Sequence, residues 1–200
     1  MSSELDLGSM STPSVLRSAR GLHHAAYRCQ DAEQTRWFYE DVIGLPLSLA
    51  FVSEEVPGLG DKQPFMHLFF ALGDGSYIAF FDQPATAQPE QFAKAHSFDR
   101  HIALEVSDEA ALLAWQKRIN AHGVSCLGPV DHGFVKSVYM YDPNGLQLEL
   151  TVRTAEHEQA FTYGAETARS ELAAWQARTR AEKVARLGAA ALDRRSRRAR

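Results

Sequence analysis

Two histidines, His24 and His101, occupy equivalent positions in a spacing that occurs twice along the chain. Each is followed seven residues later by an aspartate that precedes a helix-like stretch, Asp31 in the first case and Asp108 in the second. Neutral imidazole is the commonest metal ligand among protein side chains. The repeated spacing therefore favours metal ligation for both histidines over two unrelated structural roles.

A glutamate adds a carboxylate to this pair. Gly145 is followed four residues later by Glu149, and at the matching point of the first copy Gly75 is followed four residues later by Ala79. Two imidazoles and one carboxylate, with coordination positions left open, are the ligand set favoured by non-haem Fe(II) that activates oxygen. The same set accepts Mn(II), Zn(II) or Ni(II), depending on which ion is available. The predicted metal ligands are therefore His24, His101 and Glu149.

Short strands and two helices must position these ligands. In the first copy, strands are expected at 22–28, 47–52, 65–72 and 77–81. In the second copy, they are expected at 101–106, 125–127, 136–141 and 146–152. Each copy has one helix after its first strand: Asp31 caps a helix that Gly44 ends, and the other helix spans 108–121. The order βαβββ thus occurs twice, which predicts an α+β fold.

Strand periodicity decides which side chains share a face. In the closing strand, Gln147 and Glu149 alternate with Leu146, Leu148 and Leu150. If the leucines pack against helices, Glu149 points to the opposite face. The predicted architecture is therefore a pair of βαβββ modules that form a half-open β-barrel around a metal site.

Composition and length are consistent with this architecture. With 200 residues, 45% of them hydrophobic, the chain can bury one core or two small packed halves. No apolar run reaches the roughly 18 residues of a membrane span, and the N-terminus lacks the pattern of a signal peptide. The expected organisation is a disordered lead at 1–19, a domain at 20–153 with modules 20–84 and 99–153, and a helical, basic extension at 154–200.

Cysteine and charge patterns disfavour other classes of function. Cys29 and Cys126 form no CxxC motif, which favours a reduced, cytoplasmic setting. Residues 1–153 carry 11 Lys and Arg against 19 Asp and Glu, whereas residues 154–200 carry 10 against 6. Five arginines lie within 193–200, but no aromatic residues are interleaved with them. A solvated tail is therefore preferred to a nucleic-acid-binding one, and no membrane partner is expected.

Three segments of the chain resemble the vicinal oxygen chelate superfamily, which includes glyoxalase I, fosfomycin- and bleomycin-resistance proteins and type I extradiol dioxygenases. The segments are HHAAYRCQDAEQTRWFYEDVIGLPL in the first half, and RHIALEV and YDPNGLQLEL in the second. The resemblance covers about residues 20–153. It implies four ligand positions at the ends of the first and last strands of the modules: His24, Ala79, His101 and Glu149.

Alanine cannot coordinate a metal, so Ala79 narrows the choice within the superfamily. Glyoxalase I uses ligands at all four positions, and bleomycin-resistance proteins have lost the metal site. Fosfomycin-type thiol transferases also use three ligands, so the vacancy at Ala79 leaves more than one class of enzyme open.

A second motif resembles the extradiol dioxygenase pattern, in which a histidine, a tyrosine and a Pro-x-Gly turn precede the ligand glutamate. Here the run contains His132, Tyr139, the turn 142–145 and Glu149. The resemblance implies that His132 and Tyr139 lie in the active site, where proton donors control charge on a bound catecholate. Those enzymes also carry a histidine near the last strand of the first module. The segment 75–79 has none, and the possible substitutes are Tyr77 and His67.

The resulting prediction is an Fe(II)-dependent extradiol dioxygenase that acts on a small aromatic diol and O2. One alternative is a lyase, isomerase or thiol transferase of the same superfamily that uses Mn(II), Zn(II) or Ni(II) as a Lewis acid. A second alternative is a non-catalytic protein that binds a small apolar ligand. A homodimer is expected, because the helices of the extension have apolar faces.

Overall fold

The computed structural model describes residues 19–56, 58 and 62–194, which divide into two compact units. The first unit comprises the described part of Met1–Ile102 with Arg118–Ser125 and Met140–Leu148. The second unit comprises Ala103–Lys117, Cys126–Tyr139 and the described part of Glu149–Arg200. Nearly all of the predicted N-terminal lead, and the end of the basic tail, lie outside the described residues.

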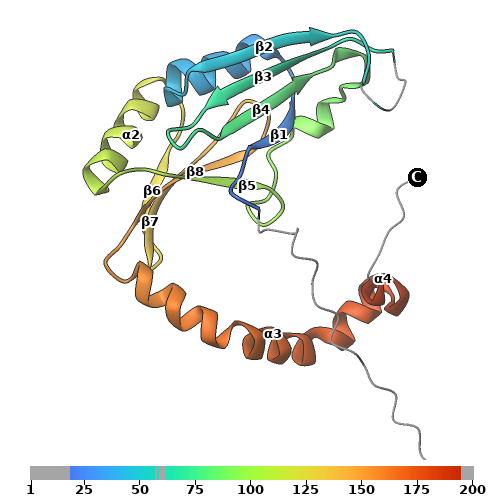
Figure 1. The fold of residues 1–200 in the computed structure, drawn as a ribbon, viewed down its shortest axis with the longest axis vertical. Coiled ribbons are helices and arrows are strands. Elements are labelled where there is room, and N and C mark those ends of the chain that lie inside the picture. The colour runs from blue at the N-terminus through green and yellow to red at the C-terminus, as the bar shows by residue number, and fades with distance from the viewer. Residues whose placement is uncertain (1–18, 57, 59–61, 195–200) are drawn as a thin grey trace, which may run out of the picture. The chain divides into compact units, whose positions relative to one another are not determined.

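The first sheet has four strands in the order β1-β4-β3-β2 (Figure 1). Its strands are β1 (His24–Cys29), β2 (Leu47–Ser53), β3 (Phe65–Ala71) and β4 (Tyr77–Asp82). β1 pairs with β4 in parallel, and the other pairs are antiparallel. All four strands fall where the alternation of apolar and polar residues predicts them, within two residues at each end.

The helix of the first unit differs from the single α-helix that the sequence predicts. Asp31 caps α1 (Ala32–Arg36), and its Oδ1 accepts a hydrogen bond of 2.7 Å from the amide of Gln34. The helix then widens into the π-helical segment η1 (Trp37–Ile43), which ends at Gly44 with a φ of 87°. The wider turns change which side chains face inward, since the hydrogen bonds now span five residues.

The core of the first unit lies between η1 and one face of the sheet. The ring of Tyr39 lies 4.8 Å from Phe80 and 5.3 Å from Phe70, measured between centroids. Phe38 and Ile78, like these three residues, are at most 1% exposed. Because strand side chains alternate, this packing sends the neighbouring residues of β3 and β4 to the opposite face.

The second sheet has the strand order β5-β8-β7-β6. Its strands are β5 (His101–Glu105), β6 (Leu127–Asp131), β7 (Val135–Tyr141) and β8 (Gln147–Arg153). The short 3₁₀ helices η2 (Pro84–Thr86) and η3 (Pro89–Phe92) precede β5, and helix α2 (Glu109–Ala121) follows β5. Each sheet keeps two edge strands, so neither closes into a barrel. The α+β class with two modules is confirmed, and the half-open barrel around a metal remains a prediction.

The turns before β4 and β8 show the duplication directly. The amide of Gly75 donates to the carbonyl of Leu72 (3.2 Å), and the amide of Gly145 donates to the carbonyl of Asp142 (3.1 Å). Both glycines adopt a positive φ, 86° and 73°. A side chain is strained in this conformation, which explains why glycine occurs at both positions.

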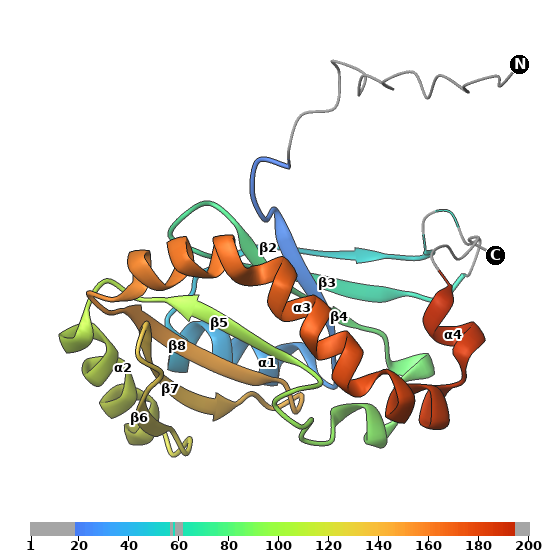
Figure 2. The same cartoon turned by 90° about the horizontal axis from the view of Figure 1, so that it is seen from below.

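The chain continues into the predicted helical extension. Helix α3 (His157–Leu187) is a single continuous helix, and the short α4 (Ala189–Asp193) follows it after Gly188 (Figure 2). Among the described residues, no helix combines the length and the apolar content that crossing a bilayer requires.

Candidate functional site

Three polar side chains of the second unit, His132, Tyr139 and Glu149, form a hydrogen-bonded group that we call the triad. The Nε2 atom of His132 lies 2.7 Å from the Tyr139 hydroxyl. That hydroxyl donates to Oε1 of Glu149 at 3.2 Å. The structure therefore brings together three of the five residues that the sequence predicts for the active site.

The strands place the triad on one face of the sheet. Tyr139 and Glu149 lie on β7 and β8, which are neighbours in the sheet. Leu148 and Leu150 flank Glu149 and are 0% and 2% exposed on the other face, as the strand periodicity predicts. Glu149 is itself only 8% exposed, and a carboxylate so buried requires compensating donors or a cation.

The protonation states within the triad follow from its geometry. Burial, and secondarily the charge of Glu149, raise the pKa of Tyr139, so this residue remains a phenol at neutral pH. A phenol has one proton, and an ionised carboxylate can only accept. When the Tyr139 proton is donated to Glu149, the bond to His132 requires a proton on Nε2 of the imidazole. In the triad, the proton of His132 Nε2 therefore points to the Tyr139 oxygen, and the Tyr139 proton points to the Glu149 carboxylate.

His101, at the start of β5, is oriented by the backbone. Its Nδ1 lies 2.9 Å from the carbonyl oxygen of Ser97. A carbonyl oxygen can only accept, so Nδ1 carries the proton, and the lone pair of the neutral ring is on Nε2. A hydrogen bond of this kind typically orients histidines that bind metals through the other nitrogen.

His24, at the start of β1, is exposed and lies beside three other rings, those of His23, His67 and Phe69. Its Nδ1 is 2.8 Å from Nδ1 of His23, a contact that the sequence does not predict. The centroid of its ring lies 5.5 Å from that of Phe69. The fourth ligand position, Ala79, is fully buried and contributes no donor.

Aromatic side chains line the face of the first sheet that is opposite the core. Phe51 pairs with His67 across β2 and β3, and His67 pairs with Phe81 across β3 and β4. His67 stacks on Phe81 at 3.8 Å and lies 4.2 Å from Phe69. We call this surface the aromatic face; its residues are Phe51, Phe65, His67, Phe69, Tyr77 and Phe81.

His67 is the polar group within the aromatic face. It is 7% exposed, and among the described residues its Nε2 has no hydrogen-bond partner. Burial, with a smaller effect of His24 at a centroid distance of 6.4 Å, lowers the pKa of His67. The sequence leaves His67 as one possible substitute for the missing first-module histidine. Phe65, His67 and Phe69 are two residues apart along β3, and this spacing would have shown that they share a face.

The predicted metal ligands are divided between the two units. His24 and His101 belong to the first unit and Glu149 to the second. Across the described ranges, no three His, Cys, Asp or Glu side chains gather into a metal-binding group within the chain. Coordination of one ion by all three residues therefore remains a prediction. The donor set itself fits a divalent metal, because His101 has its lone pair on Nε2 and Tyr139 orients the buried carboxylate of Glu149.

The turn before β8 has a structural role. Asp142 is 5% exposed, and its carboxylate accepts hydrogen bonds from the amides of Asn144 and Leu146 and from the Tyr39 hydroxyl. Burial raises the pKa of Asp142 despite these donors. At Gly145, a Cβ atom would clash with the carbonyl oxygen of Ala93. This turn therefore supports the strand that carries Glu149 rather than the chemistry itself.

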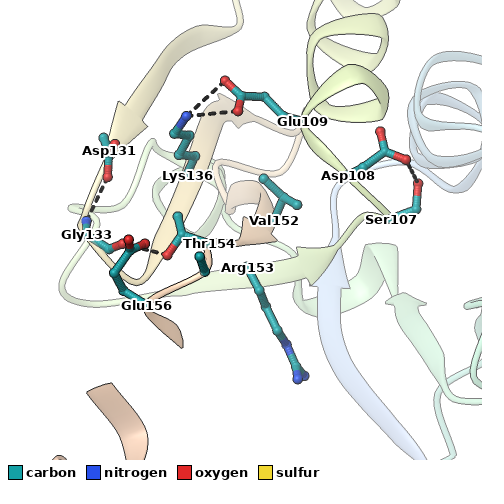
Figure 3. A pocket seen from close by; sticks show the side chains of 11 residues that line it. Ser107, Asp108, Glu109, Asp131, Gly133, Lys136, Val152, Arg153, Thr154 and Glu156 are labelled. Carbon is teal, nitrogen blue, oxygen red and sulfur yellow. Dashed lines mark hydrogen bonds and ion pairs between the residues drawn. The ribbon is translucent and has the colours of Figure 1, made fainter. Parts of the chain in front are cut away.

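A cavity of about 680 Å³ lies in the second unit (Figure 3). The start of α2, the β6–β7 hairpin and the residues after β8 form its walls. Several of its charged groups have partners: Lys136 Nζ lies 2.9 Å from Glu109 Oε2, and Asp108 caps α2 by accepting a hydrogen bond from the amide of Ala111. None of the predicted site residues lines this cavity.

The two duplicated sheets and the triad define a protein of the class built from paired βαβββ modules. The chain belongs to the glyoxalase/bleomycin resistance protein/dioxygenase superfamily, whose family model matches residues 21–150. The resemblance to the vicinal oxygen chelate superfamily is thereby confirmed.

Two solved structures illustrate the relationship. A glyoxalase/dioxygenase from Nostoc punctiforme shares 26% identity with a TM-score of 0.52, over 72% of this chain and 99% of that protein. The fosfomycin resistance protein FosX from Mesorhizobium loti shares 22% identity with a TM-score of 0.51, over 71% and 98%. At the identity of FosX, the likeness shows the fold alone.

A curated relative matches a shorter segment. MhqA of Bacillus subtilis (strain 168), provisionally named a ring-cleaving dioxygenase, is 37% identical over 51 residues. The match covers 26% of this chain and 16% of MhqA, so the chain spans a small part of that relative's length.

Proposed function

We propose that this protein is a metal-dependent dioxygenase of the extradiol type that cleaves a catechol-like aromatic ring with O2. The observation that carries the proposal is the triad, in which His132 and the Glu149 carboxylate both bond the Tyr139 hydroxyl. A carboxylate ligand with proton-bearing groups beside it suits a substrate that must lose protons on binding and regain them afterwards.

His24, His101 and Glu149 are the residues that would hold the metal, and Fe(II) is the ion this ligand set favours. The bound ion would supply the Lewis acidity and the electrons that reaction between an aromatic diol and O2 requires. The hydrogen bond from His101 to Ser97 fixes the ring so that Nε2 presents its lone pair. The hydrogen bond from Tyr139 restricts the rotation of the Glu149 carboxylate.

The remaining residues of the triad control protons. Tyr139 stays protonated because burial raises its pKa, so it acts as a hydrogen-bond donor rather than as a base. His132 is exposed, and its Nε2 bonds the Tyr139 hydroxyl. Because its Nε2 already carries a proton within the triad, His132 acts as the acid that donates this proton to a substrate oxygen and regains it when a substrate hydroxyl ionises.

The aromatic face supports an aromatic substrate. Planar rings stack favourably on aromatic side chains, and this face offers Phe69 and Phe81 on either side of His67. An oxygen substituent of a bound ring would satisfy the Nε2 atom of His67. His67 is thus our candidate for the histidine that the first module lacks at its usual place.

The comparisons support the same reaction class. MhqA and the Nostoc punctiforme protein both carry a dioxygenase designation, and the latter aligns along its whole length. FosX gives no argument for thiol transfer to fosfomycin, because its likeness extends to the fold alone.

The decisive experiment is anaerobic purification and loading with Fe(II), followed by a panel of catechols with oxygen uptake and ring-opened product absorbance as readouts. We expect stoichiometric iron and oxygen consumption with at least one catechol. Stoichiometric metal without oxygen consumption would refute the dioxygenase and favour a lyase, isomerase or transferase. Ligand binding without metal, unchanged by His24→Ala, would instead identify a non-catalytic binding protein.

A further inference from the structure

Helix α3 carries a row of small and apolar side chains along one side. The spacing alternates between four and three residues, which is the pattern of the a and d positions of a coiled coil. We call this row the α3 seam; its residues are Phe161, Ala165, Ala168, Leu172, Trp175 and Thr179.

The seam is exposed although it contains large apolar residues. Phe161 is 59% exposed, Leu172 61% and Trp175 49%. No side chain of α3 is buried among those the structure describes. Phe161 stacks on His157 and contacts the edge of Phe134 before β7 at 5.8 Å between centroids, whereas Trp175 contacts the Arg178 guanidinium of its own helix. A helix of 31 residues with such a face gains its stability in water from packing against a partner.

We propose that α3 pairs with α3 of a second copy of this chain, in an antiparallel arrangement centred near Ser170. In this register, each large seam residue lies opposite a small one: Trp175 opposite Ala165, and Leu172 opposite Ala168. A parallel pair would place Trp175 against Trp175 and leave the alanines facing each other. Alternation of large and small side chains across an interface gives the denser packing.

The charges of α3 favour the same direction. Glu158 and Glu166 lie in its first part, and no basic residue precedes Arg169 within the helix. The part after Trp175 carries Arg178, Arg180, Lys183 and Arg186 against one acidic residue, Glu182. An antiparallel pair places each acidic end beside a basic end, whereas a parallel pair places like charges together at both ends.

Like charges approach each other at the centre of the proposed pair, and this repulsion makes the register testable. Arg169 and Glu171 flank the seam on opposite sides, so in the antiparallel register each approaches its own copy. In a parallel pair they would instead approach Gly164 and Gln176. Neutralising the central charges therefore affects the two arrangements differently.

The first test is sedimentation equilibrium of the full chain, whose monomer mass is 22.2 kDa. We expect concentration-dependent formation of a species of twice that mass. Leu172→Glu should weaken association by about 100-fold or more, because two carboxylates would be buried at the seam. The matched control is Ala174→Glu, which adds the same charge two residues away on the opposite side of α3 and should leave association unchanged.

The second test addresses direction. Replacing both Arg169 and Glu171 with Gln should tighten the antiparallel dimer by about two- to fivefold and leave a parallel one unchanged. Added salt should weaken the antiparallel dimer, since its ends attract.

Three results would overturn the proposal. The first is a wild-type chain that stays monomeric at high concentration. The second is a dimer that Leu172→Glu leaves intact, because another surface would then mediate association. The third is a monomer whose melting temperature falls on Leu172→Glu, because α3 would then pack within its own chain. Circular dichroism of each variant shows whether the helix itself is retained.

Discussion

The two sheets share one backbone scaffold, but at corresponding positions the first carries apolar side chains and the second carries polar ones. On β3 and β4 of the first sheet, Phe69 pairs with Ala79. On β7 and β8 of the second sheet, the matching residues are Tyr139 and Glu149, which are joined by a hydrogen bond of 3.2 Å. The exchange adds one hydroxyl to the ring and one carboxylate to the adjacent strand. The first sheet thereby keeps an apolar surface, and the second gains a buried charge with its donor.

This difference shows how a duplicated fold divides its tasks. The backbone turns before β4 and β8 make the same bond, so the scaffold has been preserved in both copies. The side chains of the turns differ, because Leu72 in the first corresponds to the buried Asp142 in the second. The second copy thus has polar groups both at its proposed site and in the turn that supports the strand carrying Glu149.

The strongest way to break the comparison is to make the second sheet resemble the first. Glu149→Ala reproduces the residue at position 79 and removes the carboxylate ligand. We expect kcat/KM with the best catechol to fall by about 1,000-fold or more, and we expect the variant to lose stoichiometric Fe(II) binding. The matched control is Glu105→Ala, because Glu105 lies in the same sheet and forms only an exposed ion pair with Arg153. Retention of bound iron and activity in Glu149→Ala would show that the carboxylate has a structural role.

A second large effect is expected at the supporting turn. Asp142→Asn keeps an oxygen for the amides of Asn144 and Leu146 at Oδ1 but places amide protons against the Tyr39 hydroxyl and the Asn144 side-chain amide, which donate to Oδ2. We expect the free energy of unfolding to fall by about 2 kcal/mol. Asp74→Asn is the control, since Asp74 lies in the matching turn of the first copy, where its carboxylate accepts from the amide and hydroxyl of Ser76. Urea denaturation measures the free energy of unfolding of both variants. Equal losses would show that the two turns contribute equally to stability.

The pH dependence of this effect has a defined sign. Burial raises the pKa of Asp142 above that of the unfolded chain. A raised folded-state pKa contributes stability that is fully present below the unfolded value, near 3.9, and is lost as pH rises through the folded value. The stability advantage of the wild type over Asp142→Asn should therefore grow as the pH falls toward 4.

Removal of the Tyr139 hydroxyl tests the comparison at a single atom. Tyr139→Phe gives the second sheet the ring that the first has at Phe69. We expect kcat to fall by about 10- to 100-fold with iron binding retained, because His132 loses its partner and Glu149 loses its donor. The matched control is Tyr141→Phe, which removes from the same strand a hydroxyl that bonds the Ala95 carbonyl and should leave kcat unchanged. A Tyr139→Phe enzyme with full activity would show that the triad takes no part in turnover.

Sequence reasoning located the parts that depend on local rules. Most strand boundaries and turns followed from alternation and from glycine, and the triad followed from a motif within 18 residues, 132–149. The strand expected at 125–127 was placed wrongly, because β6 runs from Leu127 to Asp131. The π-helical segment was missed, because hydrogen bonds that skip one residue further leave no distinctive composition. The surroundings of His67 were missed as well, because the pairing of Phe51, His67 and Phe81 depends on strand register across three strands.

The smallest expected effect concerns His67, the polar exception within the aromatic face. Its Nε2 is buried without a partner among the described side chains, and such a group typically costs stability. His67→Phe should therefore raise the free energy of unfolding by about 1 kcal/mol, provided the slightly larger ring fits beside Phe69 and Phe81. If His67 serves the substrate, the same variant should lose catechol turnover while gaining stability. His67→Gln, which keeps a polar group of similar reach, should restore part of the turnover but none of the stability. A His67→Phe protein that is more stable and equally active would show that His67 takes no part in turnover. The aromatic face would then contribute only apolar contacts, and the proposed chemistry would depend on the second sheet.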